Sequence, residues 1–473
     1  MNKFSLVIIA IAFAFSARAQ ADISGSWSGT LNVGTELRLL FEFEKENDYY
    51  KGKLTSLDQG NTSLKFDTTY TSHDSLFVVI KQLGISYAGR RTSDSTFSGV
   101  FTQGRQFPLD LKRGGKIEEQ KRPQQPKGPF PYKENEVKFK GGADDVTLAG
   151  TVLQPAIGVL KKNGKAPVVI LVSGSGPQNR NEELMGHQPF AVLADHLARK
   201  GFMVLKYDDC GVAQSTGKFS SATTEDFAKD ALAAVNFLKT YPGVDPKRIG
   251  IVGHSEGGMV APMAANASKD VAFIVMWAGP AEKITQLMTK QTEEVSKTSG
   301  LSATEAAIYA QTYSIVVNNV VDKKLDTKGK AENAIKQLNE WAAKQDTAML
   351  NELDLDTEDK RKMLYIRIAS SASTPWMKYF LSYDPEENLR KLKIPVLALY
   401  GEKDIQVAAA ENAAAAKKYF AANKKAEVKI LPGINHLFQR CIKCDIGEYS
   451  KIEETISPAA LQAMTDWLIK VVK

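Results

Sequence analysis

Apolar and polar residues alternate in short runs over the N-terminal part of the chain, from residue 23 to residue 111. Gly, Asn and Asp residues separate these runs, of which residues 37–43, 75–80 and 107–111 are the clearest. Alternation of this kind is typical of a β-strand with one buried face. The pattern predicts a β-rich domain over residues 20–115, either a small all-β barrel or a sandwich.

A charged, proline-rich segment follows this domain. Its prolines include Pro123, Pro126, Pro129 and Pro131. Because proline fixes its own backbone and disfavours a helix at the preceding residue, this spacing favours an extended conformation. We therefore predict a linker over residues 116–135 and a second domain over residues 136–473.

The second domain alternates strand-like and helical patterns. Nearly continuous apolar runs are typical of strands buried on both faces, and their alternation with helices predicts a mainly parallel sheet with helices on both faces. The predicted strands are residues 136–140, 147–153, 167–172, 202–205, 249–252, 271–277, 395–399 and 428–431, and the predicted helices are residues 189–199, 224–239, 256–266 and 458–471.

One long segment, about residues 283–388, interrupts the alternation and is rich in Ala, Lys, Glu and Leu. Ser302 and Glu305 have the spacing of a capping box, which marks a helix start. We expect an inserted helical cap over the carboxyl ends of the strands, where open α/β sheets bind ligands.

The first 19 residues have the features of a signal peptide: Lys3, an apolar run and a final Ala17-Arg18-Ala19. We expect cleavage after Ala19 and export to the periplasm or the outside of the cell. The apolar run is shorter than the roughly 20 residues of a membrane span. A stable membrane anchor is therefore not expected.

Composition excludes several other classes of protein. A hydrophobic fraction of 43% argues against global disorder, and the formal charge of +7 is spread along the chain rather than clustered as in nucleic-acid-binding proteins. Cys441 and Cys444 have no further ligand pair nearby, so a local disulfide or two inert thiols is favoured over a metal site. No metal or other cofactor and no nucleic-acid partner are expected.

The candidate nucleophile is Ser255 in Gly253-His254-Ser255-Glu256-Gly257. This motif follows a predicted strand and opens a predicted helix, which is the context of a nucleophile elbow. A serine hydroxyl needs a base within hydrogen-bond reach, and that base needs an orienting carboxylate.

The base and the acid follow from chain order, which is Ser, acid, His in this arrangement. His436 is the one histidine after Ser255, and it lies in a loop after the last predicted strand. Asp404 follows the strand at residues 395–399 and is the preferred acid, with Glu402 as the alternative.

An oxyanion formed at Ser255 needs backbone N–H donors. We expect one from Glu256 and one from Ser175, with Gly176 as the alternative to Ser175, because the glycine-rich loop 173–177 follows a predicted strand. Gly176, His187 and Trp376 are candidate lining residues of the substrate pocket.

Several motifs together resemble secreted bacterial carboxylesterases of the EstD type. They are residues 173–181, 186–190, 207–211, 253–258, 373–376 and 435–439. The resemblance covers nearly the whole mature chain and implies an α/β-hydrolase fold with a helical cap, a β-rich (lipocalin-like) N-terminal domain, hydrolysis of short-chain acyl esters and the same three catalytic positions. Two departures, Cys210 for the usual arginine and Ala213 for a usual glycine, put the local loop structure in question.

The leading hypothesis is hydrolysis of a small-molecule carboxylic ester through an acyl-serine intermediate. A peptidase, thioesterase or acyltransferase would use the same three residues. The competing class is a lipid- or glycan-binding protein with a vestigial hydrolase core.

Overall fold

The computed structural model describes residues 22–33, 36–47, 49–57, 63–72, 74–103, 105–114, 121–155, 162–298 and 300–473. These residues belong to two units, Met1–Glu118 and Glu119–Lys473. The predicted signal peptide lies outside the described residues and stays a prediction.

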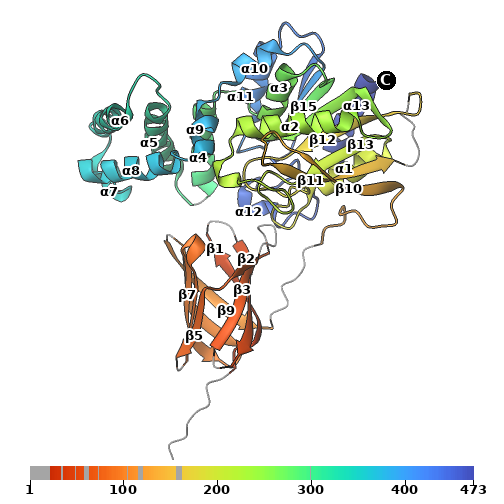
Figure 1. The fold of residues 1–473 in the computed structure, drawn as a ribbon. Helices are drawn as coiled ribbons and strands as arrows, with labels where there is room; N and C mark the ends of the chain where they lie inside the picture. The colour runs from red at the N-terminus through yellow and green to blue at the C-terminus, as the bar shows by residue number, and fades with distance from the viewer. Residues whose placement is uncertain are drawn as a thin grey trace, which may run out of the picture. The chain divides into compact units, whose positions relative to one another are not determined.

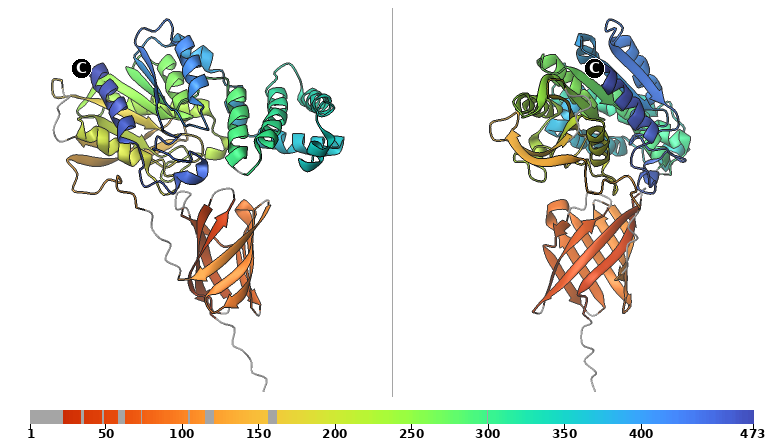
Figure 2. Two further views of the ribbon diagram at one scale, coloured as in Figure 1. Left: turned by 180° about the vertical axis from the view of Figure 1, so that it is seen from behind. Right: turned by 90° about the vertical axis from the view of Figure 1, so that its right-hand side faces the viewer.

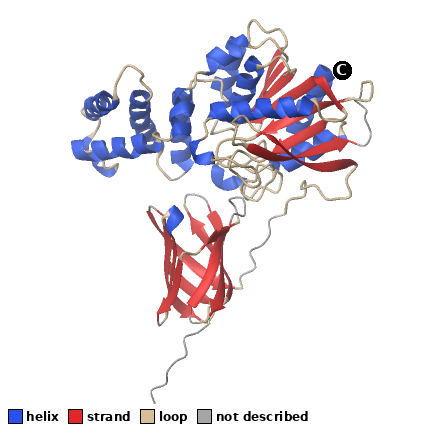
Figure 3. Ribbon diagram, in the orientation of Figure 1, coloured by secondary structure: helices blue, strands red, loops and turns tan. Residues whose placement is uncertain are grey.

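The alternating runs of the N-terminal unit form one curled, antiparallel sheet in the order β4-β3-β2-β1-β9-β8-β7-β6-β5 (Figures 1 and 3). The two ends of this order, β4 and β5, follow each other in the chain, so the sheet curves back toward its own first edge. A barrel-like sheet, and not a sandwich of two layers, is therefore the outcome. The elements are β1 (Gly25–Asn32), β2 (Glu36–Glu46), β3 (Tyr49–Ser56), β4 (Ser63–Lys65), β5 (Thr68–Ser72), β6 (Ser75–Ile80), a 3₁₀ turn (Lys81–Leu83), β7 (Ile85–Ser93), β8 (Thr96–Gln103) and β9 (Arg105–Arg113).

Aromatic side chains fill the inside of this sheet. Trp27 is fully buried against Phe97, with ring centroids 4.9 Å apart, and its indole N–H donates to the Ile23 carbonyl at 2.8 Å. The guanidinium of Arg113 lies 5.2 Å from the Trp27 ring centroid, which adds a cation–π contact at the end of the core.

The second unit contains an eight-stranded sheet in the order β10-β11-β13-β12-β14-β15-β16-β17. The pairs β10–β11 and β11–β13 are antiparallel, and the strands from β13 onward pair in parallel. The strands are β10 (Tyr132–Lys140), β11 (Thr147–Pro155), β12 (Ala166–Val172), β13 (Met203–Tyr207), β14 (Val244–His254), β15 (Phe273–Trp277), β16 (Val396–Gly401) and β17 (Ala426–Leu431).

Helices cover both faces of this sheet, as the sequence predicts (Figure 2). One apolar core joins the sheet to α2 (Thr224–Lys239), α3 (Gly257–Ala267) and α11 (Ala409–Tyr419). A second core on the other face joins it to α1 (Pro189–Arg199) and α13 (Pro458–Val472). The α/β-hydrolase fold class is thereby confirmed. Two short elements, a 3₁₀ turn (Phe219–Ser221) and α12 (Ile446–Tyr449), lie in the loops.

The helical insertion lies between β15 and β16 and has its own apolar core. In Figure 1 and in the left view of Figure 2, α5, α6, α7 and α8 stand away from the sheet, with α4 and α9 nearer to it. The capping box of Ser302 and Glu305 starts α5 as predicted. The helices are α4 (Ile284–Thr298), α5 (Ala303–Val320), α6 (Thr327–Ala342), α7 (Thr347–Glu352), α8 (Glu358–Ser371), α9 (Pro375–Ser382) and α10 (Pro385–Lys391).

The described part of the predicted linker packs on the second unit. Arg122 donates to the carbonyl groups of Met185, Gly186, Ser450 and Ile452 at 2.8–3.2 Å. β10 begins at Tyr132, before the predicted strand start, because its pairing with β11 extends to Pro155. Among the described residues, no helix has the length and apolarity needed to cross a membrane.

Candidate active site

Ser255 forms the tight turn between β14 and α3. Its φ of 51° lies in the left-handed region, which is strained for a residue with a Cβ atom, and its N–H donates to the Trp277 carbonyl at 2.8 Å. The neighbouring glycines are required sterically. A Cβ on Gly253 would lie 1.9 Å from the carbonyl oxygen of Gly257, and one on Gly257 would lie 2.2 Å from that of Val172. Strand, turn and helix therefore form the sharp elbow that the motif predicts.

His436 and Asp404 lie in contact after the carboxyl ends of β17 and β16. Nδ1 of His436 is 2.7 Å from Oδ2 of Asp404, and both side chains are buried. Oδ1 of Asp404 accepts the backbone N–H groups of Gln406 and Val407, each at 2.8 Å. Because a carboxylate only accepts, Nδ1 carries a proton and Nε2 of the neutral ring carries the lone pair. A base that acts on a hydroxyl needs this tautomer.

Glu402, the alternative acid, lies on the outer side of the same turn. Its Oε2 accepts the N–H of Gly433 at 2.9 Å, and its Oε1 lies 3.8 Å from Nζ of Lys403. Half of its side chain is exposed. The carboxylate that accepts the hydrogen bond of His436 is therefore that of Asp404.

A cavity of about 210 Å³ is lined by both Ser255 and His436. Its apolar wall comes largely from the cap, through Leu287 and Met288 of α4 and Trp376 and Phe380 of α9. The Trp376 and Phe380 rings stack with centroids 5.1 Å apart. The insertion thus supplies one side of the space in front of the elbow serine.

One of the three predicted pocket residues is among the lining residues of this cavity. Trp376 lines the cavity, whereas the described lining includes neither Gly176 nor His187. His187 is fully buried, with Nδ1 2.9 Å from Oγ1 of Thr455 and Nε2 2.9 Å from the Tyr449 carbonyl oxygen. Burial lowers its pKa to about 4, so it is a neutral structural residue beneath the site.

The predicted oxyanion loop follows β12 and runs beside the elbow. A Cβ on Gly174 would lie 3.2 Å from the Cβ of Ser255, so the two backbones are neighbours, and Ser175 lines the cavity. The N–H of Gly174 donates to Oε1 of the buried Glu182 at 2.7 Å. Ser175 and Glu256 therefore lie on the two backbone segments next to Ser255.

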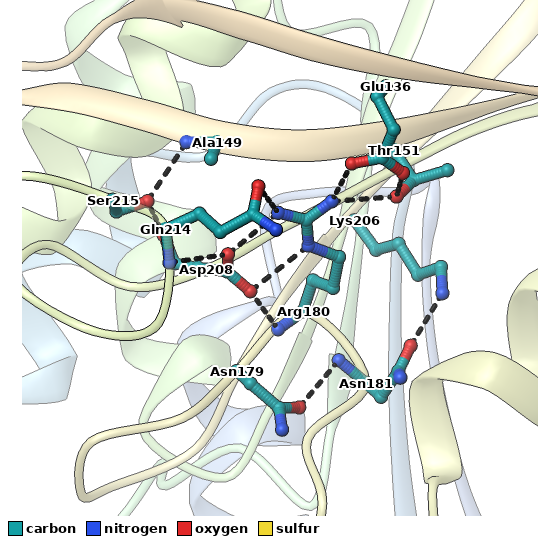
Figure 4. A network of polar contacts seen from close by, with 10 residues as sticks. All are labelled: Glu136, Ala149, Thr151, Asn179, Arg180, Asn181, Lys206, Asp208, Gln214 and Ser215. Carbon is teal, nitrogen blue, oxygen red and sulfur yellow. Dashed lines mark hydrogen bonds and ion pairs between the residues drawn. The ribbon is translucent and has the colours of Figure 1, made fainter.

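An ionic network around the largely buried Arg180 and Asp208 fixes the far end of this loop (Figure 4). The Arg180 guanidinium binds Asp208 through Nε and Nη2 at 3.1 and 2.7 Å, while the Arg180 backbone N–H donates to the same carboxylate at 2.8 Å. Nη1 of Arg180 reaches Glu136 of β10 and Thr151 of β11. Bidentate pairing of this kind sets geometry as well as charge, so the loop is tied to three strands of the sheet.

Asp209, next in the chain, is buried behind the same loop. It accepts from Oγ of Ser173 at 2.7 Å and from the Gln178 N–H at 3.0 Å. Burial raises the pKa of Asp209 well above its ordinary value, and the nearby carboxylates of Glu256 and Glu182 raise it further.

The side chain of Glu256 makes buried hydrogen bonds with α2 and with the cap. Its Oε1 accepts from Oγ1 of Thr224 at 2.6 Å and from Nε1 of Trp376 at 2.8 Å. Burial raises the pKa of Glu256, and these two hydrogen bonds partly offset that increase.

His254, which precedes the serine, lies between two other parts of the site. Its Nδ1 is 2.9 Å from Oε1 of Glu182, and its Nε2 is 3.1 Å from the backbone carbonyl oxygen of His436. Burial alone would lower its pKa, but the charge and hydrogen bond of Glu182 outweigh burial and raise it.

Two of the three cysteines are paired in a disulfide, and the third is a free thiol. Cys441 and Cys444 form a disulfide in the loop after His436. The carboxylate of Glu448 lies near both sulfur atoms, which are joined to each other and so do not offer a pair of thiolate ligands. Cys210 is a buried thiol, and burial raises its pKa.

Sequence reasoning missed Glu182, Arg180 and the acidic pair Asp208-Asp209 as parts of the site. One signal was present, because Asp208 and Asp209 follow directly on the apolar strand β13 and so lie at the ligand-binding edge of the sheet. Arg180 and Glu182, in the loop after β12, lie near the same edge of the sheet. Their mutual pairing depends on contacts across the sheet, which spacing along the chain does not reveal.

Known proteins resemble this chain in part. Esterase EstD of Thermotoga maritima is 33% identical over 147 residues, which cover 31% of this chain and 34% of the esterase, so the match spans about a third of that relative. The thiohydrolase aneE of Aspergillus aculeatus is 30% identical over 144 residues, covering 30% of this chain and 42% of the relative. Among solved structures, an esterase of Pyrococcus furiosus, Pf2001, aligns with a TM-score of 0.41 and 17% identity over 72% of this chain and 93% of its own.

The family comparison covers more of the molecule. Residues 187–440, more than half of the chain, match the family described as serine aminopeptidase S33. The matched region contains the elbow, the cap and the loops that carry Asp404 and His436. This chain therefore belongs to the serine aminopeptidase S33 family of hydrolases.

Proposed function

We propose that the protein is a serine hydrolase that cleaves carboxylic esters through an acyl-serine intermediate on Ser255. The observation that carries the proposal is that Ser255, at the strained elbow, and His436, hydrogen-bonded to Asp404, line one cavity. The likeness to esterase EstD supports an ester as the substrate.

In the first half-reaction, Oγ of Ser255 attacks the ester carbonyl carbon while Nε2 of His436 takes the hydroxyl proton. The carbonyl electron pair moves to oxygen, and the N–H groups of Ser175 and Glu256 are the proposed donors to this oxyanion. Asp404 holds the ring in position and stabilises the imidazolium that forms. Collapse of the intermediate expels the alcohol, which takes the proton from His436.

In the second half-reaction, water attacks the acyl-serine while His436 removes a proton from it. Collapse releases the carboxylic acid and returns the proton to Ser255. A cavity of about 210 Å³ is smaller than the roughly 300–1,000 Å³ of pockets for drug-sized ligands, which favours short acyl groups.

The test is a panel of nitrophenyl esters of increasing acyl length, run with the wild type and Ser255→Ala. We expect the highest kcat/KM for short acyl chains and loss of turnover in the variant. A fluorophosphonate should label Ser255, as read by peptide mass spectrometry. Equal turnover in both proteins, or no label on folded wild type, would overturn the proposal. Thioesters and aminoacyl amides of matched acyl groups report the preference between leaving groups.

We also propose that the protein is exported after cleavage behind Ala19. The features of residues 1–19 support this, and the Cys441–Cys444 disulfide suits an oxidising compartment. N-terminal sequencing of protein from the producing cells should read Gln20 first. An N-terminus within residues 1–19 would contradict the proposal.

A further inference from the structure

The His254 ring has a hydrogen-bond partner at each nitrogen, and both partners accept. Nδ1 faces Oε1 of Glu182 at 2.9 Å, and Nε2 faces the backbone carbonyl oxygen of His436 at 3.1 Å. A carbonyl oxygen has no proton to give, so Nε2 must donate. The carboxylate of Glu182 also accepts when ionised, so Nδ1 must donate too. A ring that donates from both nitrogens is an imidazolium.

A neutral arrangement of the same atoms pairs a protonated Glu182 with a neutral His254. The hydroxyl at Oε1 would then donate to Nδ1 while still accepting the N–H of Gly174, which lies at 2.7 Å. The ionic arrangement is favoured because a carboxyl is ordinarily a stronger acid than an imidazolium, and because the charge and hydrogen bond of Glu182 raise the pKa of His254 despite its burial.

The ion pair joins three segments whose relative positions matter for the proposed reaction: the oxyanion loop, the elbow and the loop that carries His436. Glu182 binds the oxyanion loop through Gly174, and His254 is part of the elbow. Nε2 of His254 binds the backbone of His436 itself, and the two imidazole rings have centroids 5.0 Å apart. Both His254 and Glu182 are buried, so water cannot substitute for either contact.

The charged groups around His254 come from several elements. Glu182 is its direct partner, and Asp404 adds a favourable charge from the turn after β16. The ring of Trp277 in β15 is tilted against that of His254, with centroids 5.2 Å apart. Other buried titratable groups described near the site are His436 and Tyr449, in the loops after β17, and Asp209 and Glu256, on the side of Glu182 and the elbow.

We propose that His254 is a positioning residue that acts as a permanent imidazolium, paired with Glu182, and holds the His436 loop and the oxyanion loop against the elbow. This inference rests on the proposed function of Ser255 and His436. The His254 and His436 rings have centroids 5.0 Å apart, so a positive charge on His254 disfavours a second positive charge on His436.

The direct test is NMR of the full chain with ¹⁵N-labelled histidine. The wild type should show two ring N–H protons for His254 at pH 8, and both signals should be missing from His254→Gln. In Glu182→Gln the partner stays an acceptor but loses its charge, so one of the two protons should be lost at that pH. A wild-type His254 with a single ring proton at pH 8 would overturn the inference, whatever the activity.

The kinetic test is the pH dependence of kcat/KM on a short nitrophenyl ester. His254→Gln should lower kcat/KM by about 10–100-fold and move the acidic limb to higher pH, because loss of the cation lets His436 take a proton more easily. A residue that only packs would lower kcat/KM at every pH and leave the limb in place, and that result would also overturn the inference.

The matched control is His196→Gln. This half-buried histidine of α1 binds Oγ1 of Thr465 at 2.9 Å, away from the cavity, so the limb should not move. Fluorophosphonate labelling of Ser255 separates the two proposals. If the wild type is labelled but its His254 is neutral, only the proposal of an imidazolium is refuted. If the wild type is not labelled but its His254 carries two ring protons, only the proposed function is refuted.

Discussion

Trp376 of the cap donates its indole N–H at 2.8 Å to the carboxylate of Glu256, the residue that follows the elbow serine. The same indole lines the cavity and stacks on Phe380. One hydrogen bond therefore fixes the position of a cap side chain relative to Ser255, and the orientation of the apolar wall depends on it.

Replacing Trp376 should change the preference for acyl length. Trp376→Ala removes the indole from the wall and enlarges the cavity, so the ratio of kcat/KM for octanoyl over acetyl nitrophenyl esters should rise about tenfold. The ratio is independent of the fraction of folded enzyme. Trp341→Ala is the control, because this cap tryptophan of α6 bonds to Gln311 and is not among the described cavity residues. An unchanged ratio in Trp376→Ala would show that this wall does not meet the acyl chain.

The two acids of the turn after β16 give a matched pair. Asp404→Asn should lower kcat by about 10³–10⁴-fold, because an amide can leave His436 in the wrong tautomer. Glu402→Gln should keep kcat within about twofold, since its carboxylate bonds to Gly433 at the surface. Steady-state kinetics on one ester, with circular dichroism to confirm folding, checks both. Comparable losses in the two variants would mean that the acid is assigned wrongly.

Ala213 should be a site where glycine stabilises the fold. Its φ of 46° is left-handed, which costs an alanine about 1 kcal/mol relative to glycine. Ala213→Gly should therefore raise the free energy of unfolding by about that amount. Ala414→Gly, at an exposed position of α11, should lower it by a similar amount because glycine disfavours a helix interior. Urea unfolding followed by tryptophan fluorescence measures both, and a change of the same sign in both would refute the backbone argument.

The buried carboxyl of Asp230 should make the free energy of unfolding depend on pH. Burial raises its folded pKa to about 6, above the ordinary value of 3.8, so the folded state binds more protons than the unfolded state between these values. Stability from this group is thus full below pH 4 and is lost as the pH rises through 6. Asp230→Asn keeps an acceptor for the Gly142 N–H and should be more stable than the wild type at pH 8 by about 2 kcal/mol.

The comparison at low pH completes this test. At pH 4 the wild-type carboxyl is already protonated, so Asp230→Asn should gain nothing there. Thermal unfolding of both proteins at pH 4 and pH 8 gives the two differences. A gain of equal size at both pH values would place the effect in packing and not in ionisation.

The fold and the three central residues follow from local signals in the sequence. The apolar runs of β12 to β16 predicted buried strands, and the glycines around Ser255 predicted a turn too tight for a Cβ. Chain order then left a single histidine for the base. Each of these inferences needs only neighbours in sequence or one topological rule.

The residues that surround Ser255, Asp404 and His436 could be identified only from the folded structure. The pairing of Glu182 with His254 joins residues far apart in the chain, and His187 moved out of the predicted pocket because Thr455 and Tyr449 enclose it. Gly176 is likewise absent from the described cavity wall. Which polar side chains face one another across a sheet depends on register and loop path, and no periodicity along the sequence records that.

The cap leaves the sheet after β15 and returns before β16, so its seven helices form one excursion between neighbouring parallel strands. Ser255 precedes this excursion, and Asp404 and His436 follow it. Insertions, deletions or exchanges within the cap therefore change the chamber in front of Ser255 without shifting any strand of the sheet. If the proposed function holds, changes in the cap would alter the admitted acyl group while Ser255, Asp404 and His436 keep their places on the sheet.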